Sequence, residues 1–360
     1  MTDAVLASPA GEHHEKGIPM KKTTVGILGA SSYTGLELVR MLVNHPGAKI
    51  DYVSSQSNAG QPFTVLFPEM FGIFDDIFIL PEQTAGKKVD CVFSCLPHAV
   101  SASFLKPIIE QGIRVIDLSA DFRIRDPRVY QHWYKTPHAC PELLTDAVFG
   151  LCEHYRKEIR SARILANPGC YPTSILLPLL PLLKEKSVQI GGIIADSKSG
   201  VSGAGRTLKL SSHFVEVYED VSAYSVGRSH RHIAEIDQEL SIAAGREIAI
   251  TFSPHLMPVN RGILSTIYLT INKTAAECRE IALAAYRNEP FVRVRDGGDL
   301  PHVKYVAHTN YCDFCYTGGV DGGPVIVVSA IDNLIKGASG QALQNMNIMF
   351  GFEEITALPK

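Results

Sequence analysis

A series of glycines near the start of the chain constrains its fold more than any other stretch. The apolar run Thr23–Gly29 is predicted to form a buried strand, and Leu36–Val43 has apolar residues at helical spacing. Glycines between a strand and a helix let the backbone turn tightly and approach a pyrophosphate, which the helix N-terminus stabilises. The stretch therefore favours a dinucleotide-binding turn over an ordinary strand–helix connection. The residues predicted to bind the dinucleotide are Gly26, Gly29, Ala30, Ser31, Tyr33, Thr34 and Gly35.

The end of the predicted second strand, Ile50–Ser54, bears on the choice of cofactor. Enzymes that use NAD usually place an aspartate or glutamate there to bind the ribose 2′-hydroxyl. Here Tyr52 is followed by Val-Ser-Ser-Gln-Ser-Asn, which offers hydroxyl and amide groups and no acid, and Asp51 lies too early in the strand. A 2′-phosphate would not be repelled, so NADP is the predicted cofactor, with Ser54 and Ser57 among its contacts.

Strand and helix patterns alternate through the first half of the chain. Further strands are predicted at Val89–Phe93 and Arg114–Leu118, and a helix is predicted at Ser101–Gln111. This alternation predicts an α/β fold with a Rossmann-type, doubly wound parallel sheet.

The second half of the chain has a different pattern, with longer strands that in part alternate with polar residues. A helix is predicted at Thr274–Asn288, and Asn333–Gly351 is predicted to form one long amphipathic helix. We expect a second α/β domain with a mixed sheet and helices on one of its faces. The predicted strands are Val188–Lys198, Ile248–His255, Ile263–Asn272 and Val325–Ala330.

Length and composition fit a soluble protein of two domains. A chain of 360 residues exceeds the usual size of a single core, and a formal net charge of −3 gives no basic footprint for nucleic acid. The apolar run Ile175–Leu183 is too short to span a bilayer, so no membrane partner is expected. Eight cysteines without a secretory signal are expected to be reduced thiols in the cytoplasm. Residues 1–20 lack a targeting pattern and are predicted to be a disordered extension.

One cysteine stands out as a candidate nucleophile. Cys170 lies in the sequence Asn-Pro-Gly-Cys-Tyr-Pro-Thr (167–173), where a turn precedes an apolar segment. If that segment begins a helix, its N-terminus would stabilise a thiolate and lower the pKa of the thiol. The alternative is a buried, inert cysteine. Cys312 and Cys315 form a single C-x-x-C pair without a second ligand pair, so no metal site is expected.

Two further polar segments could assist such a nucleophile. His230 and His232 flank an arginine, and such a cluster could supply a proton donor and hold an anion, although a solvated polar loop would have a similar composition. The glycine-rich stretch Ser199–Arg206 exposes backbone N–H groups and ends in a cation, which suits a phosphate or an oxyanion. A flexible connector is the alternative for this stretch.

With these motifs in view, the chain from about Lys21 onward resembles the N-acetyl-γ-glutamyl-phosphate reductase family. The sequence departs from the family pattern at Ser32, where glycine is expected, and at Cys152 and Ala234, where the family tends to have proline. We expect these changes to affect packing and loop shape only. The motifs that carry the resemblance are 29–35, 117–123, 167–173, 199–206, 230–232, 254–262 and 332–341.

The resemblance implies a glyceraldehyde-3-phosphate-dehydrogenase-like architecture. Residues 21–169 and 333–360 would form the NADP-binding Rossmann domain, and residues 170–332 the catalytic and oligomerisation domain. The implied reaction is the NADPH-dependent reduction of N-acetyl-L-glutamyl 5-phosphate to the 5-semialdehyde, with release of phosphate, in arginine biosynthesis. A homo-oligomer, dimer or tetramer, is implied as well.

The resemblance also implies roles for individual residues. Cys170 would be the nucleophile, His230 the acid–base group and His232 its neighbour. Asn333 would lie against the nicotinamide. Arg123, Arg206 and the segment that begins with Ser199 and Gly200 would bind the anionic substrate.

Other functions remain open from the sequence. The substrate could be a homologous acyl phosphate, such as aspartyl or N-acetylaminoadipyl phosphate. The chain could be a dinucleotide-sensing protein without catalysis, although both the cysteine and the histidines are present. A cysteine hydrolase would not explain the dinucleotide turn.

Overall fold

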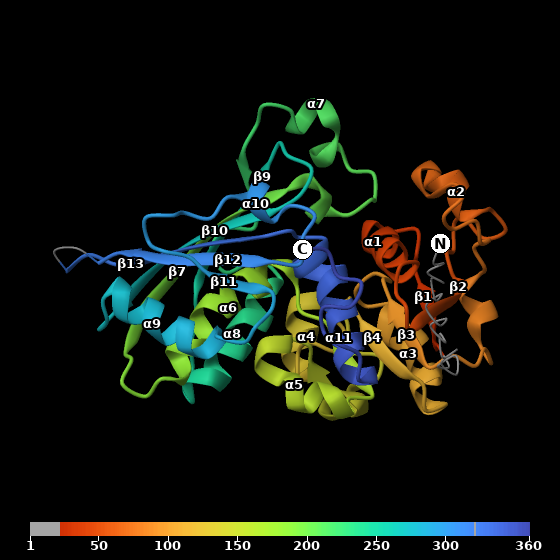
Figure 1. Cartoon of the computed structure of the whole chain (residues 1–360), viewed down its shortest axis with the longest axis horizontal. Helices are drawn as coiled ribbons and strands as arrows, with labels where there is room; N and C mark the ends of the chain where they lie inside the picture. Colours follow the sequence, from red (N-terminus) through yellow and green to blue (C-terminus); the bar gives the residue numbers. More distant parts are fainter. Residues whose placement is uncertain (1–21, 320–321) are drawn as a thin grey trace, which may run out of the picture.

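The computed structural model describes residues 22–319 and 322–360, and the predicted disordered extension of residues 1–20 lies outside the described residues. Within this part the chain builds two sheets, each with its own helices and its own core (Figure 1). The expected combination of a parallel, doubly wound sheet with a second, mixed sheet is confirmed.

The first sheet is parallel, with strand order β2-β1-β3-β4-β6-β5. Helices α1, α5 and α11 cover one face, and α3 covers the other. The chain winds in opposite directions from β1, so a crevice opens at the carboxyl ends of β1 and β3, where doubly wound sheets bind ligands. The elements are β1 (Thr23–Leu28), α1 (Tyr33–Leu42), β2 (Ala48–Val53), α2 (Phe63–Leu66), β3 (Cys91–Ser94), α3 (Ser101–Glu110), β4 (Arg114–Asp117), α4 (Pro127–Tyr134), β5 (Ala147–Phe149), α5 (Cys152–Ser161) and β6 (Ile164–Ala166).

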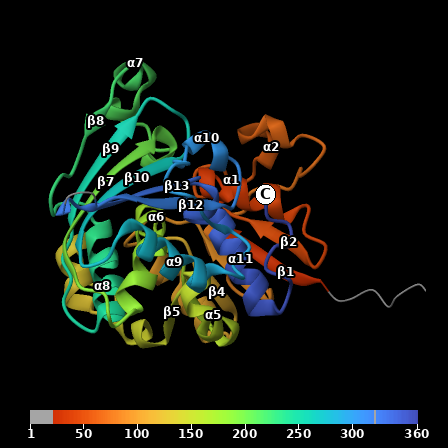
Figure 2. The ribbon, with the colours of Figure 1, turned by 60° about the vertical axis from the view of Figure 1, so that its left-hand side comes forward.

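The second sheet is mixed, with strand order β11-β12-β13-β10-β7-β9-β8. Helices α6, α8 and α9 pack on one face of it, which Figure 2 shows from a second direction. The elements are α6 (Cys170–Lys184), β7 (Ile190–Gly200), α7 (Phe214–Val217), β8 (Ser222–Ala223), α8 (His232–Ala244), β9 (Thr251–Met257), β10 (Ile263–Ile271), α9 (Ala275–Tyr286), β11 (Val292–Val294), α10 (Val303–Val306), β12 (Cys312–Gly318) and β13 (Val325–Ile331).

Helix α6 runs unbroken through Pro178 and Pro181. A proline has no N–H to donate, so Pro181 leaves the carbonyl of Leu177 without its helical partner. The hydroxyl of Tyr286 donates to that carbonyl at 2.5 Å instead. A tertiary hydrogen bond therefore lets the helix that begins at Cys170 continue into the core.

The prediction of one long amphipathic helix at the C-terminal end is wrong in two respects. After Asn333 the chain first forms a π-helical turn, Ile335–Ser339, and α11 (Gly340–Phe350) follows. The polar face of α11 is also buried, and Gln341 and Asn345 both donate hydrogen bonds to the carbonyl of Gly150, which precedes α5. The segment thus returns to the first sheet and packs on α5 and α1.

The π-helical turn contains a buried charge whose removal should destabilise the fold. Lys336 is fully buried and pairs with the buried carboxylate of Glu153 at 2.6 Å. Lys336→Met leaves that carboxylate without a counter-charge, so we expect the free energy of unfolding to fall by about 3–5 kcal/mol. Urea unfolding followed by circular dichroism measures this, with the exposed Lys304→Met as the matched control, expected to change stability by less than about 0.5 kcal/mol. Equal stability of the two variants would contradict the prediction.

Candidate active site

Cys170 is the first residue of α6 and follows a tight turn after β6. Two glycines make room around it. A Cβ on Gly169 would lie 2.9 Å from both the guanidinium of Arg123 and Nε2 of His232, and a Cβ on Gly337 would lie 2.7 Å from Cβ of Cys170. The backbone of the π-helical turn therefore packs directly against the candidate nucleophile.

A buried ion pair holds the turn before Cys170. Arg123 donates from Nε to the carbonyl of Asn167 at 2.7 Å and pairs with Glu235 of α8 at 3.3 Å. The other carboxylate oxygen of Glu235 accepts the N–H of Gly169 at 2.8 Å. Both charged side chains are almost completely buried. Arg123 and Glu235 thus fix the backbone on both sides of Pro168.

The expected lowering of the Cys170 pKa by the helix N-terminus is wrong for the protein without substrate. Burial raises the pKa of the thiol to about 11, and the N–H of Tyr171 and the charge of Arg123 lower it only in part. Desolvation disfavours a thiolate more strongly than the first turn of α6 stabilises it. The thiol is therefore protonated at neutral pH.

The two predicted histidines lie together beside Cys170. Their rings are 4.8 Å apart, and the ring of Tyr171 packs edge-on against both. Burial lowers the pKa of His230 to about 4 and that of His232 well below its ordinary value, and Arg231 lowers both further. Both imidazoles are neutral at pH 7.

The hydrogen bonds of His230 determine which of its nitrogens carries the proton. Its Nδ1 accepts the backbone N–H of His232 at 3.1 Å. A neutral imidazole has one donor and one acceptor nitrogen, so the proton resides on Nε2. His230 can therefore donate a hydrogen bond from Nε2. Nδ1 of His232 is buried and has no hydrogen-bond partner among the described residues.

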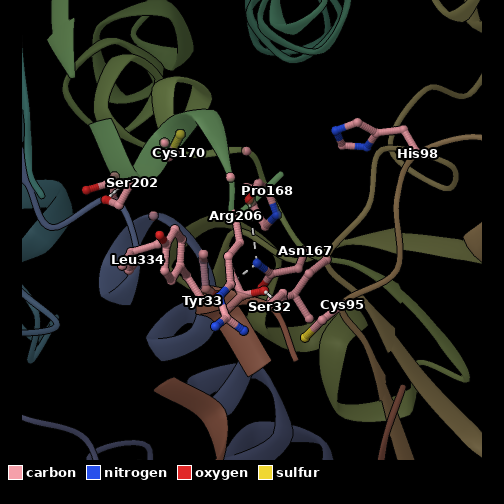
Figure 3. Close-up of a pocket in the computed structure, with 18 of the residues that line it drawn as sticks. Ser32, Tyr33, Cys95, His98, Asn167, Pro168, Cys170, Ser202, Arg206 and Leu334 are labelled. Carbon is pink, nitrogen blue, oxygen red and sulfur yellow. Dashed lines mark hydrogen bonds between the residues drawn. The ribbon is translucent and has the colours of Figure 1, made fainter. Parts of the chain in front are cut away.

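Two cavities meet at Cys170. The first, which we call the turn cavity, has a volume of about 290 Å³ and extends from Ser32 and Thr34 of the glycine-rich turn to Cys170 and Asn333 (Figure 3). The second, the histidine cavity, has a volume of about 360 Å³ and is lined by Cys170, His230 and His232. Neither lining contains an aspartate or glutamate, whereas arginine or lysine contributes to both.

The glycine-rich turn has the conformation that its sequence predicts. Gly29 adopts a φ of +68°, and a Cβ on Gly35 would lie 2.5 Å from the backbone of Ala30, so the first turn of α1 packs closely on the turn that follows β1. At Ser32, where the family pattern has glycine, the side-chain hydroxyl caps α1 by accepting the N–H of Gly35 at 3.0 Å.

Some residues predicted to bind the cofactor do not line the turn cavity. Gly26 is part of β1, where a Cβ would overlap the ring of Tyr52. Ser54 is fully buried, and its hydroxyl has no hydrogen-bond partner among the described residues. Ser57 is exposed beyond the end of β2. The hydroxyl of Ser31 accepts a hydrogen bond from Ser55 at 3.0 Å, which joins the turn to that end.

The predicted substrate contacts are placed in different surroundings. Ser199 lines the histidine cavity, whereas Gly200 packs against the backbone of Arg261 outside both cavities. Arg206 lines the turn cavity and donates to the carbonyl of Ser31 at 3.0 Å. Asn333 accepts the N–H of Gly262 at 2.6 Å and donates to Ser202 at 3.0 Å, and it also lines the turn cavity.

Sequence reasoning missed two residues of the site. His98 lines both cavities, and its Nδ1 accepts the N–H of Ala120 at 2.9 Å, while burial lowers its pKa to about 4. Glu235 orders the turn before Cys170. Both residues could have been identified from their positions, because His98 follows the carboxyl end of β3 and Glu235 lies one helical turn after His232. Among residues 22–319 and 322–360, no group of His, Cys, Asp or Glu side chains could hold a metal ion.

Comparison with known families matches both halves of the chain. Residues 24–162 match the family described as "Semialdehyde dehydrogenase, NAD binding domain", and residues 170–333 match "Semialdehyde dehydrogenase, dimerisation domain". A protein from Pelotomaculum thermopropionicum named N-acetyl-gamma-glutamyl-phosphate reductase is 50% identical over 93% of this chain and 97% of its own length. One of that name from Geobacter metallireducens is 48% identical over the same shares.

The chain belongs to the N-acetyl-gamma-glutamyl-phosphate reductase family. It is also similar in structure to more distant proteins. Aspartate semialdehyde dehydrogenase II of Vibrio cholerae, complexed with ASA, superimposes with a TM-score of 0.70 at 16% identity, over 92% of this chain and 99% of that one. Aspartate semialdehyde dehydrogenase of Candida albicans, with NADP, gives 0.68 at 16% identity over the same shares. At such low identity the likeness concerns the fold that the reductase family shares with these enzymes.

The raised pKa of Cys170 predicts how its alkylation depends on pH. With a pKa of about 11, only on the order of one thiol in 10⁴ is ionised at pH 7. Because the thiolate is the reactive form, we expect the rate of modification by iodoacetamide to rise about tenfold per pH unit up to pH 10. Mass spectrometry of the peptide that contains Cys170 measures the rate, with a short unstructured cysteine peptide as the control, whose rate levels off near the ordinary thiol pKa of ~8.5. A plateau for Cys170 below pH 9 would contradict the structure.

Proposed function

We propose that the chain catalyses the NADPH-dependent reduction of N-acetyl-L-glutamyl 5-phosphate to N-acetyl-L-glutamate 5-semialdehyde and phosphate, a step of arginine biosynthesis. The observation that carries the proposal is the junction of two cavities at Cys170, one of which reaches the dinucleotide turn. The names of the relatives at about 50% identity support the choice of substrate.

The residues of the turn cavity fit a nicotinamide dinucleotide. The close packing of Gly35 on Ala30 and the N-terminus of α1 provide a cradle for a pyrophosphate. Asn333 and Cys170 at the far end would adjoin the nicotinamide. The absence of an acid in residues 54–58 supports NADP over NAD. When bound, the cofactor supplies the hydride that reduces the acyl group.

Cys170 would attack the carbonyl carbon of the acyl phosphate, expel phosphate and form a thioester. Its proton must leave in this step, because the thiol is protonated at rest. His232 lines both cavities with Cys170, is neutral and has an unpartnered ring nitrogen, so we assign it as the proton acceptor. The negative charge of the arriving phosphate favours the imidazolium that results.

His230 would serve as a hydrogen-bond donor. Its Nδ1 is occupied by the N–H of His232, so Nε2–H is free to donate. It would stabilise the oxyanion of the adduct that precedes the thioester and that of the adduct that follows it, both of which are bonded to Cys170. Collapse of the last oxyanion breaks the carbon–sulfur bond, releases the aldehyde and returns the thiolate of Cys170. The apolar ring of Tyr171 behind both histidines helps to keep water from the thioester.

The proposal includes a homo-oligomer in the cytoplasm. The segment 208–226 exposes Leu208, Leu210, Phe214 and Val215, each by more than two thirds, which supports burial against a second copy. All eight cysteines are free thiols, which supports a reducing compartment. Within the described residues no helix is long and apolar enough to cross a membrane.

Loss of the nucleophile tests the proposed reaction. Cys170→Ala should lower kcat by a factor on the order of 10³ or more and leave NADPH binding nearly unchanged. Cys170→Ser should be almost as slow, because an alcohol ionises far less than a thiol. The assay is phosphate-dependent reduction of NADP with N-acetylglutamate semialdehyde, compared with the aspartate and N-acetylaminoadipate semialdehydes. Retention of a tenth of the wild-type rate in Cys170→Ala, or a faster reaction with another aldehyde, would refute the proposal.

Two substitutions of His230 test its role as a donor. The carboxamide nitrogen of His230→Gln can occupy the place of Nε2, whereas the shorter His230→Asn cannot, so kcat should fall by roughly 10²–10³-fold in His230→Asn and by clearly less in His230→Gln. Steady-state kinetics and the phosphate burst without NADPH measure both steps. If the two variants were equally slow and the burst returned only at high pH, His230 would be the base that accepts the Cys170 proton.

A further inference from the structure

Arg206 occupies a place that its role as a substrate contact does not explain. It follows Gly205, which has a φ of +81°, in the segment after β7, so it belongs to the second domain. Its guanidinium nevertheless reaches the first domain, where it donates to the carbonyl of Ser31 at 3.0 Å and lies 5.0 Å from the centre of the Phe67 ring. In Figure 3 Arg206 extends beside Tyr33 and Ser32 of the dinucleotide turn.

The charge of Arg206 is not balanced by the protein. The other arginine of the turn cavity, Arg123, is buried and paired with Glu235. Arg206 is exposed and forms no ion pair with any residue in the described part of the chain. The lining of the turn cavity contains no carboxylate. A guanidinium without a counter-charge beside the N-terminus of α1 is suited to an anion with several oxygen atoms, since both offer hydrogen-bond donors.

We infer that Arg206 binds a phosphate group of the dinucleotide and thereby links the second domain to the cofactor. The inference rests on the proposed function, because it requires NADPH in the turn cavity. The dinucleotide offers two such groups. In such folds the pyrophosphate binds at the N-terminus of the first helix, here α1, and the 2′-phosphate binds near the end of β2. The hydrogen bond between Ser55 and Ser31 joins the end of β2 to the turn. Arg206 contacts Ser31, which lies between these two places.

The same segment connects the cofactor with the catalytic residues. Ser202 accepts a hydrogen bond from Asn333, and Gly203 packs on the hydroxyl of Ser199 and lines both cavities. A phosphate bound by Arg206 would therefore hold in place the segment 202–206, which contributes to the lining of both cavities.

Calorimetric titration of the full chain with NADPH and with NADH tests the inference. Loss of a charged, forked donor should raise the Kd for NADPH roughly 10–100-fold in Arg206→Gln. Arg206→Lys should fall between this variant and the wild type, because lysine keeps the charge and loses the fork. Arg160→Gln is the matched control, since it removes the same charge from an exposed position that lines neither cavity, and its Kd should stay within twofold. Thermal unfolding of each variant verifies that it is folded.

The outcomes distinguish binding of the 2′-phosphate from binding of the pyrophosphate, and failure of this inference from failure of the proposed function. A loss confined to NADPH assigns Arg206 to the 2′-phosphate, and an equal loss for NADH assigns it to the pyrophosphate; either result supports the inference. Unchanged affinities in Arg206→Gln, with tight NADPH binding by the wild type, would overturn the inference and leave the proposed reaction intact. A wild-type chain that binds neither dinucleotide would overturn both.

Discussion

The buried ion pair between Arg123 and Glu235 is the interaction on which the site depends. Arg123 follows β4 of the first domain and Glu235 lies on α8 of the second, and between them they hold the carbonyl of Asn167 and the N–H of Gly169. Such a pair contributes little net stability, because both charges lose their water, but loss of one partner leaves an uncompensated buried charge. Its effect here is geometric. The backbone that presents Cys170 is fixed relative to both domains at once.

Burial also sets the charge state of the site. Burial raises the pKa of Cys170 and lowers those of His230 and His232, so a neutral thiol faces neutral imidazoles. Thiolates, which are the species that oxidants and alkylating agents attack, are rare in this state. An anionic substrate changes the balance, because its charge favours a protonated imidazole.

Local patterns predicted the fold and the helix that begins at Cys170, and they failed where contacts between residues distant in sequence decide the outcome. Glycine spacing predicted the turn at Gly29, and the Asn-Pro-Gly-Cys motif predicted the start of a helix at Cys170. The direction of the Cys170 pKa could not be predicted, because burial depends on residues far away in sequence. The place of Arg206 beside Ser31 depends on how the two domains meet. The apparent amphipathic helix at the C-terminal end was wrong for the same reason, since its polar face is buried.

That buried polar face explains how the dinucleotide turn and the nucleophile keep a fixed separation. Asn345 donates to the side chain of Asn167 at 3.2 Å, and the carbonyl of Ala338 accepts from the same Asn167 at 3.1 Å. Ser339 donates to the carbonyl of Thr34 in the dinucleotide turn at 2.8 Å. A single returning segment therefore bonds to both the turn that cradles a cofactor and the turn that presents Cys170. An apolar helix could slide by a fraction of a turn at little cost, whereas any shift of this one would leave buried amides without partners. Hydride transfer requires reacting atoms held at close distance, and these buried hydrogen bonds constrain the two turns relative to each other within the first domain.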